Sequence, residues 1–218
     1  MGILPHALVN SLARLGWSHG DQEEFSIQEL VDLFSLTNVG KSAGIFNMDK
    51  LLDLNGKYIR AEDDARLADL LLPFLADLGY SGLDKEQVTG AVRTLKPRAK
   101  TLVEMAQGAL FYFREITYDK DADERFLRPE FLEILEDLLA ELKTAPEFSQ
   151  KGLEGVFLAL LEKHQIKLGK IAQPVRVALT GKTVSPGIFE VMEVLGRQNV
   201  LKRLAHAISH IKGKKAKG

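Results

Sequence analysis

Hydrophobic residues recur along most of the chain with the three- and four-residue spacing of amphipathic helices. The segment 5–15 shows this clearly, because apolar residues stand at 8, 9, 12 and 15, between Pro5 in the first turn and Gly16. Leucines repeat at the same spacing over 64–79, where Pro73 is expected to kink the helix. No alternating pattern of five or more residues indicates a strand. The pattern predicts an all-α fold, a helical bundle of about ten short helices in two to three subdomains.

Polar residues at the starts of these segments support the same assignment. Ser26 with Glu29, and Thr101 with Glu104, have the spacing of a capping box. Three further segments follow a candidate cap, namely Asn47, Asp84 and Ser149. The periodicity breaks at 58–63 and again at 143–149, "KTAPEFS", so we expect joints there.

The composition is that of a globular chain that can bury a core. Of its 218 residues, 45% are hydrophobic and 27% are charged. The lack of cysteine excludes disulfides, thiolate metal sites and cysteine nucleophiles, and it fits a reducing cytoplasm. No apolar run approaches the roughly 18 residues of a membrane helix, and we recognise no secretory signal. We therefore expect a cytoplasmic protein without a membrane partner.

The net charge of −1 conceals an uneven distribution. Residues 151–218 contain 13 Lys or Arg and 4 Asp or Glu, a net charge of +9, which leaves −10 for residues 1–150. Four of these positive charges lie at the end of the chain, where we expect disorder: Lys212, Lys214, Lys215 and Lys217. An excess of +5 remains without them. This excess suggests a polyanionic partner for the last third of the chain.

The stretch "KLGKIAQPVRVALTGKTVSPG", residues 167–187, concentrates the candidate chemistry. It holds no acid and four cations, of which Lys167, Lys170 and Lys182 are candidate phosphate contacts. Its pattern predicts a helix with a central proline, a stop at Gly181 and a new helix start at 185–186. Three apolar side chains can pack on splayed bases, namely Leu168, Pro186 and Ile188. Two polar side chains, Gln173 and Arg176, can read base edges. This combination suits a single-stranded RNA loop. The alternative is a proline-kinked helical hairpin with solvated lysines.

Other motifs do not establish a catalytic or metal site. "NVGKSAG" resembles a phosphate loop at 40–42, but Ser35 replaces the required first glycine and the stretch follows a predicted helix. His206 and His210 have the spacing of a zinc-binding pair without an evident third ligand, which favours a solvent-facing pair. No G-x-S-x-G nucleophile motif occurs. The sequence therefore offers no candidate catalytic residue and no candidate metal ligand set.

Five segments together resemble the C-terminal half of bacterial glutamyl-tRNA synthetase. They are "LPHALVNSLARLGWSHGDQEEFS", "KLLDLNGKYI", "KPRAKTLVEMA", "KLGKIAQPVRVALTG" and "SPGIFEVMEVLG". They follow the family's order and approximate spacing over essentially the whole chain. The resemblance implies the anticodon-binding fold of class I aminoacyl-tRNA synthetases. It further implies a stem-contact-like helical region at 1–60, anticodon-binding helical subdomains at 61–144 and 145–212, and a basic tail at 213–218.

The resemblance also implies a function. It predicts a tRNA-binding, anticodon-recognition part that positions tRNA(Glu) for aminoacylation, as a monomer and without DNA. The family's catalytic Rossmann domain, with its ATP-site motifs, has no counterpart in the chain. We therefore expect no ligase activity from the chain alone and no cofactor, since ATP and Mg²⁺ belong to the intact enzyme. The alternative function is a helical protein-interaction module without tRNA specificity, in which the acidic residues 1–150 bind a basic partner.

The family's roles transfer to matching positions of this sequence. Arg98, in "KPRAKTL", matches the arginine that reads the third anticodon base, which suits the rigid fork of a guanidinium. A helix-junction salt bridge is the alternative for Arg98. Residues that match positions near the first two bases are Leu168, Gln173 and Arg176, and the motif "SPGIF" adds Ser185, Pro186 and Ile188.

Overall fold

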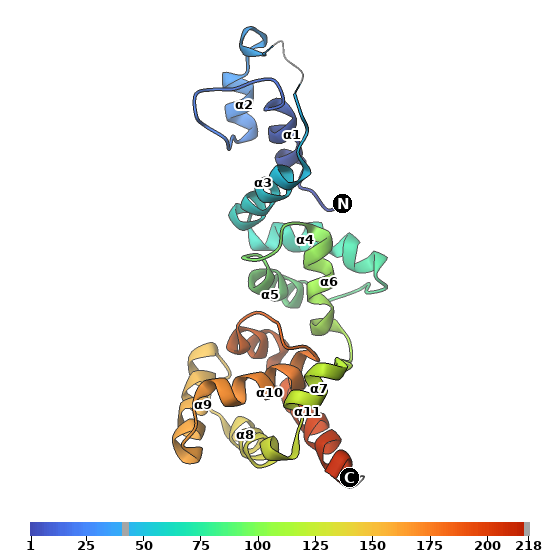
Figure 1. Cartoon of the computed structure of the whole chain (residues 1–218), viewed down its shortest axis with the longest axis vertical. Coiled ribbons are helices and arrows are strands. Elements are labelled where there is room, and N and C mark those ends of the chain that lie inside the picture. Colours follow the sequence, from blue (N-terminus) through green and yellow to red (C-terminus); the bar gives the residue numbers. More distant parts are fainter. Residues whose placement is uncertain (41–43, 216–218) are drawn as a thin grey trace. The chain divides into compact units, whose positions relative to one another are not determined.

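The computed structural model describes residues 1–40 and 44–215, and these residues form α-helices and short 3-10 helices without a β-strand. The α-helices are α1 (Pro5–Ala13), α2 (Ile27–Leu33), α3 (Met48–Ala61), α4 (Asp64–Asp77), α5 (Lys85–Leu95), α6 (Leu102–Phe113), α7 (Lys120–Phe126), α8 (Leu132–Thr144), α9 (Gln150–His164), α10 (Leu168–Thr180) and α11 (Ile188–Lys215). The 3-10 helices are η1 (Leu36–Asn38) and η2 (Pro129–Phe131). The predicted all-α fold is confirmed (Figure 1).

The predicted caps begin the helices as expected, with one exception. In α2, Ser26 Oγ accepts from Glu29 N (3.1 Å) while Glu29 Oε2 accepts from Ser26 N (2.7 Å), which completes a capping box. Single caps are also confirmed for α3, α5 and α9, at Asn47, Asp84 and Ser149. Before α6, Thr101 accepts from Glu104 N (3.0 Å), but Glu104 accepts from Lys100 N (2.9 Å). Thr101 therefore caps α6 as predicted, but the reciprocal bond of the capping box goes to the backbone N–H of Lys100 and not to that of Thr101.

Two residues that disfavour helix, Pro73 and Gly196, have different effects on the helices that contain them. Pro73 lies inside α4, which continues to Asp77. Gly196 interrupts α11 with φ 73° and ψ 158°, a conformation outside the helical region. The helix predicted to start at 185–186 therefore exists as α11, which consists of two parts joined at Gly196.

Contacts between residues divide the chain into two compact units, Met1–Ala109 and Leu110–Gly218. The first unit contains α1 to α5 and most of α6, and the second contains the end of α6 and α7 to α11 (Figure 1). The sequence-based division at residues 60, 144 and 212 stays a prediction.

Two buried asparagines organise the first unit. Asn55 on α3 is fully buried; its Oδ1 accepts from Leu4 N (2.8 Å) and its amide nitrogen donates to Lys100 O (2.6 Å). Asn10 on α1 accepts from Phe25 N (2.8 Å). These side chains satisfy backbone groups of segments that have no helical partner there. The N-terminal segment, α3 and the residues before α6 are thereby fixed to one another.

In the second unit, α10 lies within the core. Seven of its 13 residues are buried, and it packs against α7 and α11. Helix α11 also contacts α8 and α9. Since α10 carries no acid and is apolar over most of its surface, the sequence permits this burial. Only the ends and one edge of α10 remain for contact with another molecule.

Replacing Asn55 by alanine removes both hydrogen bonds and leaves Leu4 N and Lys100 O without this partner. We expect Asn55→Ala to lower the free energy of unfolding by about 2–4 kcal/mol. Urea denaturation monitored by fluorescence of Trp17, the single tryptophan and a buried residue of the first unit, measures this change. Asn38→Ala, at an exposed site, is the matched control and is expected to change stability by about 0.5 kcal/mol or less. If both substitutions lower the free energy of unfolding equally, the hydrogen bonds of Asn55 do not have the stabilising role assigned to them.

Candidate nucleic-acid interface

The candidate interface is built on α10 and the turn that follows it. Gly181 ends the helix with φ 78°, a left-handed conformation that favours glycine. A Cβ atom at this position would lie 2.1 Å from Thr117 O, and Gly181 O accepts from Asp119 N (2.9 Å). The backbone of Thr117–Asp119 therefore lies directly against the turn. This close approach fixes where residues 182–187 leave the helix.

Three of the predicted base-contacting residues meet in one hydrogen-bonded group, which we call the Arg176 cluster: Gln173, Arg176 and Ser185. Arg176 Nε donates to Ser185 Oγ (2.9 Å), and Ser185 Oγ donates to Pro186 O (2.9 Å). With the Gln173 amide oxygen oriented toward Arg176, it accepts from Arg176 Nη1 (3.1 Å) and the amide nitrogen donates to Thr183 O (3.3 Å). The cluster joins α10 to its turn, although its members are up to 12 residues apart.

Thr180 and Thr183 complete this arrangement and were not among the predicted residues. Thr180 Oγ1 donates to Arg176 O (2.8 Å) and accepts from Lys182 N (3.2 Å). Thr183 contributes its carbonyl oxygen to Gln173. The position of Thr180 directly before the helix-ending Gly181 could have indicated its role, since a threonine hydroxyl can bond to the preceding helical turn.

The apolar candidates differ in exposure. Leu168, the first residue of α10, is 40% exposed, whereas Ile188 is 6% exposed and Pro186 is buried. Leu168 offers a surface on which a base can pack. Pro186 and Ile188 instead pack inside the unit and support the turn. Direct base contact by all three residues stays a prediction.

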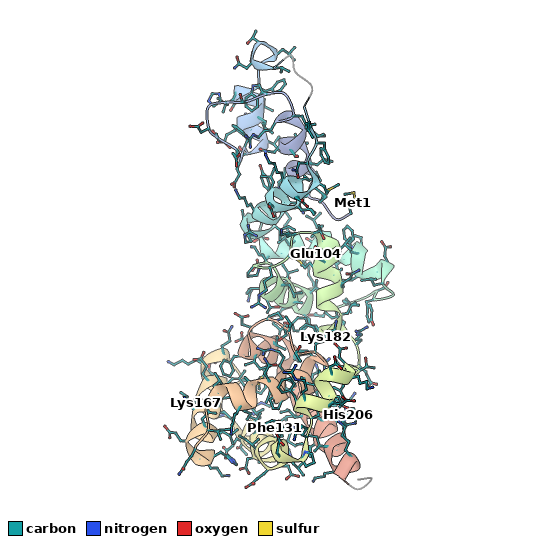
Figure 2. All side chains as sticks on the ribbon, viewed as in Figure 1. Met1, Glu104, Phe131, Lys167, Lys182 and His206 are labelled. Carbon is teal, nitrogen blue, oxygen red and sulfur yellow. The ribbon has the colours of Figure 1, made fainter. Side chains whose placement is uncertain are left out.

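The three candidate phosphate contacts lie at the two ends of α10. Lys170 lies in the first turn of the helix. Lys167 precedes the helix and Lys182 follows its last residues, and both are labelled in Figure 2. All three are exposed. Within residues 1–40 and 44–215, no carboxylate forms a salt bridge with any of them. Their charges are therefore available to an external anion.

Many other cations of residues 151–218 are neutralised inside the second unit. The ion pairs are Lys163–Asp137 (2.8 Å), Lys202–Glu115 (3.1 Å), Lys212–Glu136 (2.6 Å) and Lys214–Asp123 (2.6 Å). The expectation of disorder at Lys212 and Lys214 is therefore wrong, because α11 continues to Lys215 and both side chains are paired. Lys217 lies outside the described residues, as does the side chain of Lys215.

Two arginines of α11 bind the protein's own backbone. Arg203 donates to Leu179 O (2.6 Å), at the end of α10, and to Phe111 O (2.8 Å). Arg197 donates to Ala145 O (2.5 Å), beyond the end of α8, and its guanidinium lies over the ring of Phe148. Both arginines satisfy carbonyl groups near helix C-termini, where positive charge is favourable. These two positive charges, which form part of the excess over residues 151–218, therefore stabilise the fold.

Arg98 lies in the first unit, in the turn between α5 and α6, and its side chain is exposed. The turn is anchored by Lys96, whose ammonium group contacts Glu62 O and pairs with Asp64 (2.9 Å). Burial raises the pKa of Asp64, but hydrogen bonds from Lys96 and Arg93 outweigh it and hold that pKa below its ordinary value. Arg98 is thus presented by a well-anchored turn. Base reading by Arg98 stays a prediction.

The remaining candidates do not form a site. His206 Nδ1 is 2.9 Å from Tyr118 Oη, and His210 Nε2 is 2.8 Å from Asp123 Oδ1. Burial raises the pKa of Tyr118 to about 12, so its hydroxyl stays protonated at neutral pH. No group of three potential metal ligands occurs in the described part of the chain. Lys41 and Ser42, of the phosphate-loop-like motif, lie outside the described residues.

No helix within the described ranges is both long and apolar enough to cross a membrane.

Comparison with known proteins matches residues 66–208 to the family model "Anticodon binding domain". Two curated relatives are named "Glutamate--tRNA ligase": the protein of Desulfosudis oleivorans is 51% identical over 212 residues, and that of Syntrophobacter fumaroxidans is 52% identical over 212. Each match covers 97% of this chain and 45% of the relative, so the chain spans about half the length of these proteins. A crystal structure of a glutamate tRNA ligase from Elizabethkingia meningosepticum has the same fold. The two structures superpose with a TM-score of 0.86 at 24% sequence identity, and the match covers 96% of this chain and 42% of the Elizabethkingia chain.

The close approach at Gly181 predicts a large effect of adding a single methyl group. We expect Gly181→Ala to destabilise the protein by at least about 2 kcal/mol, because it adds left-handed strain to the clash with Thr117 O. Urea denaturation followed by circular dichroism measures the change. Gly155→Ala is the matched control: Gly155 is exposed on α9, a Cβ there meets nothing within 4 Å, and we expect a gain of about 0.5–1 kcal/mol. A neutral Gly181→Ala would disprove the close approach.

The Lys96–Asp64 pair predicts a pH-dependent component of stability. Because the folded-state pKa of Asp64 is lowered, the pair stabilises the protein above pH 3.8 and stops doing so as the pH falls through that lowered pKa. We expect Asp64→Asn to lower stability by about 1 kcal/mol at pH 7, and the difference from the unmodified protein to shrink below pH 3.8. Urea denaturation monitored by Trp17 fluorescence at several pH values measures this. Asp69→Asn removes a more exposed pair with Lys85 and serves as the control.

Proposed function

Because the chain belongs to the family of anticodon binding domains, we propose that it binds tRNA and reads bases of the anticodon loop. The observation that carries this proposal is the Arg176 cluster, which lies within the matched residues between lysines that have no acidic partner in the described structure. An oriented guanidinium provides donors for base edges, and the lysines provide charge for the phosphate backbone.

The proposal extends to tRNA(Glu) and to its aminoacylation. The support is the name of the relatives, "Glutamate--tRNA ligase", together with identities near 50% over 97% of this chain. In this proposal the chain positions tRNA(Glu) as a monomer in the cytoplasm, while an ATP- and Mg²⁺-dependent catalytic domain outside the chain carries out aminoacylation. The chain itself uses no cofactor, because its role is to bind RNA.

The two kinds of contact divide the work of recognition. Lys167, Lys170 and Lys182 supply affinity that does not depend on sequence, since phosphates are the same at every nucleotide. Arg176 on α10 supplies preference for particular bases, and Arg98 does so from the first unit. Only the first contribution should weaken steeply with salt. The two contributions can therefore be separated experimentally.

The alternative, a protein-interaction module that binds a basic partner through its acidic residues 1–150, is less well supported. Several acids of this region pair with lysines of the second unit, among them Asp123, Glu136 and Asp137. These carboxylates are therefore already partnered. The family match, which covers residues 66–208, also favours RNA binding over this alternative.

The direct test measures binding of the chain to a glutamate tRNA anticodon stem-loop, and to three loops each altered at one anticodon base, over a salt series. We expect salt-dependent binding that favours the unaltered loop. Arg176→Ala should weaken binding by about 1–3 kcal/mol and relax preference at one of the first two bases, and Arg98→Ala should do so at the third. Equal binding to all four loops contradicts base reading.

The same salt series tests the phosphate contacts. Lys170→Ala is expected to weaken binding to all four loops alike and to reduce the slope of log K against log salt by about 1. Lys202→Ala provides the matched control, because this lysine is also exposed on a helix but is paired with Glu115. We expect its slope to equal that of the unmodified protein. A reduced slope for both variants would indicate an effect of net charge alone.

A further inference from the structure

We propose that Arg203 is a positioning residue for base reading by Arg98, on which it acts from the opposite end of α6. The inference rests on the proposed function. It is carried by three hydrogen bonds from one guanidinium to the ends of two helices. Arg203 Nη1 donates to Leu179 O, near the end of α10 (2.6 Å). Its Nη2 donates to Phe111 O (2.8 Å) and Arg114 O (3.0 Å), at the end of α6.

The carbonyl groups that Arg203 binds cannot all be satisfied within their own helices. The last four carbonyls of an α-helix have no intrahelical partner, and positive charge is favourable beside them. Phe111 lies in the last turn of α6, and Leu179 lies in the last turn of α10. Because the two terminal nitrogens of a guanidinium can donate in different directions, one arginine joins both helix ends.

The position of Arg203 is fixed by the core of the second unit. Its neighbours on α11 include Val200, Leu204 and Ala207, which are fully buried, and α11 packs against α10. Burial lowers the pKa of Arg203, since desolvation disfavours the charged form, but an arginine stays protonated at neutral pH. A charged, partly buried guanidinium on a packed helix is a firm attachment for the end of α6.

Helix α6 is the element that the two compact units share. It begins in the first unit, and its last residues belong to the second. Its start is attached within the first unit, because Leu102 N donates to Gly2 O (2.9 Å). Arg98 lies in the turn that leads directly into this start. Arg203 therefore binds the end of the same helix whose beginning follows the Arg98 turn.

Attachment at both ends of α6 matters because base reading depends on direction. Hydrogen bonds to base edges weaken steeply when the donor is misaligned, whereas attraction to phosphate depends mainly on charge. Without Arg203, the helix behind the Arg98 turn loses the attachment of its far end. Helix α10 keeps its place, because seven of its 13 residues are buried. Loss of Arg203 should therefore reduce preference at the third anticodon base and spare the first two.

The test compares Arg203→Met with Arg197→Met, read out as the ratio of affinities for the unaltered anticodon loop and for each loop altered at one base. Arg197 is the matched control on α11, because it also donates to carbonyls at a helix end, those of Leu142 (3.4 Å) and Ala145 (2.5 Å). We expect Arg203→Met to reduce the ratio at the third base by about fivefold or more. The ratios at the first two bases should stay within about twofold, as should all three ratios in Arg197→Met. Equal losses at all three bases, or no loss at the third, would overturn the positioning role.

Two further comparisons separate position from charge and from direct contact. Arg203→Lys keeps the positive charge but offers one terminal nitrogen in place of two, so we expect it to lose preference at the third base as well. It also carries the comparison if Arg203→Met does not fold. In an Arg98→Ala background, replacing Arg203 should cause no further loss at the third base. Full preference in Arg203→Lys, or a further loss without Arg98, contradicts the assigned role.

A measurement without RNA distinguishes failure of this inference from failure of the proposed function. If the unmodified chain binds all loops equally, the proposed function fails, and the role of Arg203 in base preference fails with it. Amide hydrogen exchange tests the attachment in the free protein. Arg114 N donates to Leu110 O (3.2 Å) in the last turn of α6, and we expect its amide to exchange faster in Arg203→Met. Lys202→Met should leave it unchanged, because Lys202 forms an exposed pair with Glu115. Unchanged exchange in Arg203→Met would overturn the attachment, whatever the RNA measurements show.

Discussion

The candidate interface depends on one steric constraint, the contact between the backbone at Gly181 and the carbonyl of Thr117. A Cβ at this position would lie 2.1 Å from that oxygen, so the residue must be glycine, and its left-handed conformation (φ 78°) ends the helix and sets the direction of the turn. The direction brings Thr183 and Ser185 back beside α10, where they meet Gln173 and Arg176. A hydrogen-bonded group of side chains, distant in sequence, therefore follows from a single left-handed glycine.

In the second unit, the net charge does not show where unpaired positive charge lies on the surface. An RNA would meet the unpaired surface charge and not the net charge. The sequence shows an excess of +9 over residues 151–218, but the structure pairs several of these cations with acids of residues 115–137 and directs Arg197 and Arg203 to backbone carbonyls. In the described part of the chain, the lysines around α10 form no salt bridge with an acid, and residues 167–187 themselves contain none. If α10 forms the interface, the absence of acids in residues 167–187 indicates it more directly than the total charge does.

Features set by neighbouring residues could be predicted from the sequence, and features set by distant contacts could not. Caps such as Ser26 and Ser149 act within one helical turn, and so does the stop at Gly181. The pairing of Lys214 with Asp123 joins residues 91 apart, so the sequence could not distinguish a paired lysine from a disordered one. The burial of Ile188 likewise depends on how α11 packs, and no local pattern separates a core isoleucine from one that faces a base.

Helix α10 is a core element and, in the proposed function, also part of the RNA interface, and this limits how it can change. Its buried residues hold it against α7 and α11, so it cannot shift to follow a ligand without disturbing the core. Adaptation to RNA must therefore come from exposed side chains, chiefly the lysines at its ends. Arg176 is the intermediate case, because it starts from a rigid helix but its guanidinium is attached to the turn. Under the proposed function, this arrangement would separate a fixed arginine that selects bases from exposed lysines that attract the backbone, which is the division that discrimination between similar RNAs requires.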